Sequence, residues 1–317
     1  MDTITGAELV AQALIEKKIK HIFSLSGGHI TPIYQHLEGT DVKIYDTRHE
    51  QSAVFMAEAW GKMTRKAGVA MVTAGPGFTN ALTGVASAHF SNTPLVLIAG
   101  CVGLDNKEKL DLQDMPQEAV IKPMVKKALV CMKAERVIEY VDMAFRIAES
   151  GRPGPVYLEF PIDVLNCPVD KASVRRTNTC VSSHPSDPDK AKSLMEMIAA
   201  AEKPLVIAGT GAWQSHAEAE LKTFIEATGI PLLPLFPAGV FYPIPIPYAL
   251  KGLLPSVLAV DSQPILKPIW LLFWEPVSPF IICSGMCLTR RRRLPRWTLI
   301  PKRSAGTGVS TCPSQVI

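Results

Sequence analysis

The amino-acid sequence lacks the features that direct a chain to an oxidising compartment. Its seven cysteines are scattered, odd in number and mostly set among apolar residues, which argues against a disulfide framework. No basic segment followed by an apolar run opens the chain, so no signal peptide is evident. We therefore expect a cytoplasmic protein.

Positive charge is scarce in most of the chain. Residues 1–234 carry 24 lysines and arginines against 27 acidic residues, whereas residues 235–317 carry 9 against 2. Binding to a phosphate backbone requires a clustered basic face, so an acidic body gives no reason to expect a nucleic-acid partner.

Metal and dinucleotide signatures are missing as well. No histidines and cysteines cluster at metal-ligand spacing, so we predict no metal site in this chain. Gly209-Thr210-Gly211 lies between a predicted strand and a predicted helix, but it lacks the third glycine and the downstream acid of a dinucleotide fingerprint. A nucleotide-dependent oxidoreductase is therefore the least supported function.

What the chain does contain is the alternation of an α/β protein. With 317 residues, 47% of them apolar, it can form about two domains. Short apolar runs alternate with amphipathic segments in the first half, which predicts a parallel sheet with helices on both faces. We expect helices at 5–18, 30–38, 50–64, 77–89 and 135–150, and strands at 21–25, 42–46, 68–73, 94–99 and 155–159.

A second α/β domain is predicted to begin and then stop. Residues 1–172 form the first predicted domain, and the polar, aperiodic residues 173–188 form a linker. Residues 189–235 begin a truncated second domain. Its expected elements are helix 189–201, strand 204–208, helix 215–228 and strand 230–235.

From residue 236 the composition changes abruptly, which favours a reading frame lost near Phe236. Of 26 prolines, 14 lie in residues 231–317, and this density interrupts helices and strands, so we expect an irregular or disordered tail at 236–317. The apolar stretch 266–288 contains three prolines, Lys267 and Glu275, which argues against a membrane anchor.

Glu50 is the first candidate for chemistry, because it stands where a predicted strand passes into a predicted helix. In an open α/β sheet, ligands bind beyond the carboxyl ends of the strands. The helix dipole also favours a carboxylate in the first turn, so a purely structural role is the alternative. The functional interpretation is a general acid or base whose proton affinity is tuned by burial against Val54 and Phe55.

Two glycine-containing loops are predicted at the same edge of the sheet. Gly75-Pro76-Gly77 lets a ligand approach the backbone without meeting a Cβ atom, although such a tripeptide also makes an ordinary strand-to-helix turn. Ser26-Gly27-Gly28-His29 ends the first strand and offers an imidazole near Glu50, although a loop histidine is more often structural. Gln113 is uninformative by itself.

Six sequence blocks together resemble a known family, the N-terminal pyrimidine-binding domain of thiamine diphosphate-dependent enzymes of the acetolactate synthase superfamily. In order, they are GGHITPIY, YDTRHEQSAVFMAEAWGK, GVAMVTAGPGFTNALTGVASA, PLVLIAG, LQDMPQEAVIKPMVKKA and GRPGPVYLEFPIDVL. The first two blocks are closer to the 2-hydroxyacyl-CoA lyase, acetolactate synthase-like and benzaldehyde lyase branch. Residues 189–235 resemble the opening of the family's central domain.

The resemblance implies roles for particular residues. Glu50 matches the glutamate that hydrogen-bonds the aminopyrimidine ring of the cofactor and promotes its activation. His29 and Gln113 match catalytic residues on the substrate side of the thiazolium, where a polar donor can steady a developing alkoxide. The matches to the cofactor-binding blocks are Gly27, Gly28, Thr73, Gly75, Pro76, Gly77 and Asn80.

The resemblance also implies Mg²⁺, which the family holds with the diphosphate through a Gly-Asp-Gly sequence and paired asparagines. Neither sequence occurs in this chain, so we expect half of each site and no activity from the chain alone. Family members form homodimers or tetramers with sites between subunits. FAD occurs in relatives, and nothing in this sequence supports it.

The leading interpretation is the N-terminal part of a carbon–carbon lyase or carboligase. The resemblance implies thiamine diphosphate as cofactor and a small 2-oxo acid, aldehyde or 2-hydroxyacyl compound as substrate. The alternative is a non-catalytic α/β module for binding or assembly, which copurification with a diphosphate-domain protein would favour.

Overall fold

The computed structural model describes residues 2–176, 186–234, 270–273, 287–290 and 297–300. The chain divides into two compact units, Met1–Pro185 and Ser186–Ile317. The predicted linker residues 177–185 and most of the predicted irregular tail lie outside the described residues, as does Phe236, near which we expect the reading frame to be lost.

The first unit is built on a six-stranded sheet in which every paired strand is parallel, as predicted. Its order is β3-β2-β4-β5-β7-β6, so the chain reverses direction across the sheet after β3. The strands are β2 (His21–Ser24), β3 (Lys43–Asp46), β4 (Gly68–Val72), β5 (Leu95–Cys101), β6 (Lys127–Val130) and β7 (Pro155–Pro161).

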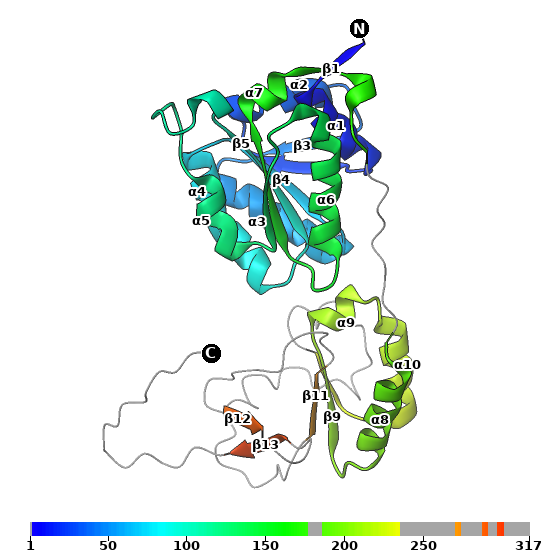
Figure 1. Cartoon of the computed structure of the whole chain (residues 1–317). Coiled ribbons are helices and arrows are strands. Elements are labelled where there is room, and N and C mark those ends of the chain that lie inside the picture. Colours follow the sequence, from blue (N-terminus) through cyan, green and yellow to red (C-terminus); the bar gives the residue numbers. More distant parts are fainter. Residues whose placement is uncertain (1, 177–185, 235–269, 274–286, 291–296, 301–317) are drawn as a thin grey trace, which may run out of the picture. The chain divides into compact units, whose positions relative to one another are not determined.

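Helices cover both faces of this sheet, which explains why its central strands are apolar throughout (Figure 1). One apolar cluster joins the sheet to α1 (Gly6–Glu16), α2 (Thr31–Leu37), α6 (Val137–Glu149) and α7 (Ile162–Asn166). A second cluster joins the opposite face to α3 (Glu50–Thr64), α4 (Pro76–Phe90) and α5 (Gln117–Ile121).

The predicted elements of this unit are confirmed, but several short elements were missed. Thr5 caps α1, because its Oγ1 accepts a hydrogen bond from the Glu8 amide at 3.2 Å. Three to five residues are too few to show a period. The missed elements are α5, α7, β6 and the antiparallel pair of β1 (Thr3–Thr5) and β8 (Pro168–Asp170).

The second unit contains α8 (Pro188–Ala199), β9 (Pro204–Ala208), α9 (Thr210–Gln214), α10 (Glu218–Thr228) and β10 (Leu232–Pro234). Thr210 and Gly211, which were expected between a strand and a helix, instead belong to α9, which begins at Thr210. The predicted helix 215–228 begins later, since His216 has a left-handed backbone (φ 56°) that separates α9 from α10.

Strands also occur where an irregular tail was expected. β11 (Trp270–Phe273) lies parallel to β9, and β12 (Cys287–Arg290) pairs with β13 (Trp297–Ile300). Each is a four-residue stretch without proline, so the proline density of the tail does not prevent pairing there. None of the helices in the described part of the chain combines the length and apolar character needed to cross a bilayer.

Candidate functional site

The candidate site lies beyond the carboxyl ends of four neighbouring strands of the first unit. Because the strands are parallel, the segments that follow β2, β3, β4 and β5 all leave the sheet at one edge. These segments carry His29, Glu50, the Gly75–Gly77 turn and Gln113, respectively. The sheet topology thus brings the residues expected from the sequence to a common edge.

Glu50 is the first residue of α3 and is only 7% exposed. Its Oε2 accepts a hydrogen bond from Asn80 Nδ2 of α4 at 2.9 Å. Its Oε1 faces the turn, since a Cβ atom at Gly77 would lie 3.3 Å from it. Among the described residues Oε1 accepts no hydrogen bond, so one carboxylate oxygen is fixed and the other is available to a donor.

The expected burial of this carboxylate against Phe55 is wrong in part. Val54 is fully buried, whereas Phe55 is 39% exposed. Five residues along a helix lead away from the face that holds Glu50, while four residues lead back to it. Asn80 of α4 contacts the carboxylate instead.

The Gly75–Gly77 turn brings backbone to the crevice. Gly75 has φ 60° and ψ −117°, a combination that glycine adopts and L side chains avoid. Pro76 then begins α4, where its missing N–H costs nothing. A Cβ atom at Gly77 would lie 2.7 Å from Thr73 Cγ2, so a side chain there would close the space beside Glu50.

His29 lies beside the carboxyl ends of β4 and β5. Its Nδ1 is 3.4 Å from Thr73 Oγ1, and a Cβ atom at Gly100 would lie 2.4 Å from the His29 Cβ. Burial lowers the pKa of His29, and the Asp111 carboxylate and a hydrogen bond with Gln113 oppose that effect. The imidazole is therefore held toward its neutral form.

Gln113 meets His29 from the loop of residues 102–116, which connects β5 to α5. Its φ of 68° is left-handed, a conformation that costs a residue with a Cβ atom about 1 kcal/mol. A Cβ atom at Gly75 would lie 2.7 Å from the Gln113 Cβ, so the loop packs directly on the turn. Residues with a strained backbone cluster at active sites, so the left-handed Gln113 agrees with a functional position.

The structure thus brings most of the predicted site residues together. Gly27 belongs to the group, because a Cβ atom there would lie 2.4 Å from the Thr73 Cβ. Two predicted residues lie at its margin: Gly28 has open space around it, and Pro76 is exposed.

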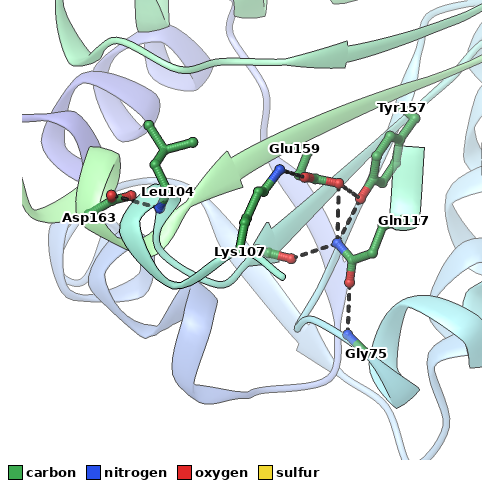
Figure 2. A network of polar contacts seen from close by, with 8 residues as sticks. Gly75, Leu104, Lys107, Gln117, Tyr157, Glu159 and Asp163 are labelled. Carbon is green, nitrogen blue, oxygen red and sulfur yellow. Dashed lines mark hydrogen bonds and ion pairs between the residues drawn. The ribbon is translucent and has the colours of Figure 1, made fainter. Parts of the chain in front are cut away.

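Three further buried polar residues behind the turn were not predicted from the sequence. Gln117, Tyr157 and Glu159 form one hydrogen-bonded network (Figure 2). The available signal was Glu159, a single acid inside the apolar strand PVYLEFP. An acid in such a run is expensive to bury unless it is paired.

Other potential sites are weaker. No cluster of three or more histidine, cysteine, aspartate or glutamate side chains suited to a metal occurs in the described ranges. A cavity of the second unit lies between α8 and α10, but its lining is apolar apart from Glu220. It offers no set of polar groups that could orient a charged cofactor.

A parallel α/β domain with a half-buried histidine, a glycine turn and a glutamate at one sheet edge has the arrangement in which open α/β sheets bind ligands. Residues 4–122 match the family described as thiamine pyrophosphate enzyme, N-terminal TPP binding domain. Residues 191–253 match the central domain of the same enzymes, and this match continues past residue 235. The chain therefore belongs to the thiamine diphosphate-dependent enzymes of the acetolactate synthase superfamily.

Individual relatives agree with this assignment. The chain is 34% identical over 244 residues to acetolactate synthase isozyme 3 large subunit of Escherichia coli, a match covering 74% of this chain and 42% of the relative. It is 42% identical over 160 residues to 2-hydroxyacyl-CoA lyase 2 of Danio rerio, covering 50% of this chain and 26% of the relative. The chain thus spans less than half the length of the curated relatives it matches.

Proposed function

We propose that residues 1–172 form the pyrimidine-binding half of the active site of a carbon–carbon lyase or carboligase. The observation that carries this proposal is the carboxylate of Glu50, with Oε2 held by Asn80 and Oε1 open beside Gly77. A carboxylate fixed in this way can accept a proton or a hydrogen bond from a ring nitrogen without reorienting.

The residues present fit the cofactor. When bound, thiamine diphosphate supplies an aminopyrimidine and a thiazolium carbon that forms bonds to carbonyl carbons. Glu50 would hold a proton at the pyrimidine ring, and Asn80 keeps the carboxylate oriented. Gly75 and Gly77 let the ring approach the backbone closely.

On the substrate side, His29 and Gln113 would orient the reacting carbonyl group. A neutral imidazole can donate one hydrogen bond and accept one, and the side-chain amide of Gln113 can also do both. Their substrates on this proposal are a small 2-oxo acid, an aldehyde or a 2-hydroxyacyl compound. The match to 2-hydroxyacyl-CoA lyase 2 and to acetolactate synthase supports this range.

We further propose that the diphosphate and Mg²⁺ are held by groups outside the described residues. The outer face of α3 supports contact with a second copy of the chain: Phe55, Met56, Trp60 and Met63 lie at helical spacing and are between 37% and 60% exposed. The opposite face of α3 is already buried. An exposed apolar patch on a helix whose other face is already packed is typical of a surface for protein contact.

Isothermal titration calorimetry of the whole chain with thiamine diphosphate and Mg²⁺ tests the site. We expect weak binding, and binding roughly tenfold weaker in Glu50→Gln, because a charge-assisted hydrogen bond is lost. The matched control is Glu58→Gln on the same helix, whose carboxylate bonds Lys62 and Ser91 away from the crevice.

The outcomes separate the parts of the proposal. Equal binding by Glu50→Gln and wild type would remove Glu50 from its role. Tight binding by the wild-type chain would contradict the half-site. A stable complex with a diphosphate-domain protein that is indifferent to Glu50→Gln would favour a non-catalytic assembly module.

A further inference from the structure

A buried carboxylate lies behind the candidate site, at the end of β7. Glu159 is only 2% exposed. Its Oε2 accepts hydrogen bonds from the Tyr157 hydroxyl at 2.7 Å and from Gln117 Nε2 at 3.3 Å, and its Oε1 lies 3.4 Å from Lys107 Nζ (Figure 2). The proposed chemistry uses none of these side chains.

Gln117 connects this carboxylate to the glycine turn. Its side chain is 1% exposed, and its Oε1 accepts a hydrogen bond from the Gly75 amide at 2.7 Å. Its Nε2 also donates to the Gly100 carbonyl at 3.0 Å, beside His29. By accepting a hydrogen bond from the Gly75 amide, the side chain of Gln117 therefore holds in place the turn that brings Gly77 next to Glu50.

Lys107 connects the same carboxylate to the substrate side. It lies in the 102–116 loop, which carries Gln113. A second carboxylate fastens this loop, since Asp163 Oδ2 accepts a hydrogen bond from the Leu104 amide at 2.8 Å (Figure 2). Left-handed residues at Glu108 and Leu110 make the loop costly to hold in place without such contacts.

We propose that Glu159 is a positioning residue, which fixes the Gly75–Gly77 turn through Gln117 and the Gln113-bearing loop through Lys107. The inference rests on the proposed function, because these two segments are the walls of the proposed site. A buried carboxylate adds little net stability over an apolar residue, even when paired, but a fully satisfied network selects one arrangement of the groups it joins.

Amide exchange of the whole chain, measured by NMR without added cofactor, tests this proposal. Lys107→Met should speed exchange in the 102–116 loop roughly tenfold, as expected for the loss of about one buried contact. Glu159→Gln should speed both the loop and the Gly75 amide. The control Lys109→Met removes an exposed lysine from the same loop and should change neither.

The titration of His29 gives a spectroscopic readout. It is monitored by NMR, and the His29 resonance is assigned by its loss in His29→Gln. Two groups of the 102–116 loop act on this pKa, since the Asp111 carboxylate and a hydrogen bond with Gln113 raise it against the larger effect of burial. Lys107→Met, which loosens the loop, should therefore shift the His29 pKa, and Lys109→Met should not.

Unchanged loop exchange and an unchanged His29 pKa in Lys107→Met would overturn the proposal, as would equal effects of Lys109→Met. Should Glu159→Gln fail to fold, Tyr157→Phe removes one donor from the same carboxylate and decides the matter through the same two readouts. Because no cofactor is present, these results stand apart from the binding test of Glu50.

Discussion

Asn80 on α4 donates a hydrogen bond to Glu50 on α3 over 2.9 Å, so the N-terminal parts of two neighbouring helices meet at one carboxylate. The contact joins residues thirty positions apart. Both helix N-termini favour a negative charge at this point. The orientation of Glu50 therefore depends on how the two helices pack, and the chemistry proposed for it depends on that orientation.

Replacement of Asn80 by alanine should lower the free energy of unfolding by about 1.5 kcal/mol, the lower end of the usual contribution of a hydrogen bond to a charged group, because Asn80 is exposed. Chemical denaturation followed by circular dichroism measures this change. Thr83→Ala is the control, since Thr83 is an exposed side chain on the same helix. Equal effects of the two substitutions would show that the bond contributes nothing measurable.

The fold of the first unit was predictable because its long elements repeat their apolar residues at helical or strand spacing. Gly75 and Gly77 were recognised from residue type alone. The contact between Gly75 and Gln117 was not predictable, since it joins a backbone amide to a side chain 42 residues away. Likewise, the second unit was predicted with helices 189–201 and 215–228 but without α9, and the left-handed His216 that separates α9 from α10 leaves no mark in the sequence pattern.

The folded state should lose stability as the pH falls below the ordinary pKa of histidine. Burial lowers the pKa of His29 in the folded state, so the unfolded chain takes up the proton first. The stability that is present above about pH 6.5 is then lost as the pH falls through the lower, folded-state value. We expect the free energy of unfolding, measured by denaturant unfolding between about pH 8 and about pH 5, to fall less steeply with decreasing pH in His29→Gln than in wild type. Identical slopes would mean that His29 titrates alike in both states.

Substitution of Met63 by glutamate should weaken self-association if the outer face of α3 packs on a second copy. Met63 is 60% exposed, and a charge there would lose its water on contact. Light scattering after size-exclusion chromatography should show a mass of at least two chains for wild type and a shift toward one chain for Met63→Glu. Met132→Glu is the control, because Met132 is equally exposed, at 58%, outside α3. A wild-type protein that stays monomeric at high concentration would exclude the contact.

Substitution of Gly77 by alanine should destabilise the first unit by roughly 1–3 kcal/mol, because the new Cβ atom overpacks the turn. Its nearest contact, at 2.7 Å, is Thr73 Cγ2, and Thr73→Ser removes that methyl group while keeping the hydroxyl beside His29. The double variant should therefore recover most of the lost stability, a coupling that denaturation of both single variants and the double variant measures directly.

Gly84→Ala, whose Cβ atom would meet Val54 at 2.7 Å, should gain nothing from Thr73→Ser. Because the alanine methyl would still lie 3.3 Å from Glu50 Oε1, the recovered protein should bind thiamine diphosphate less well than wild type. Strictly additive losses would show that Thr73 and Gly77 do not share the space beside the carboxylate.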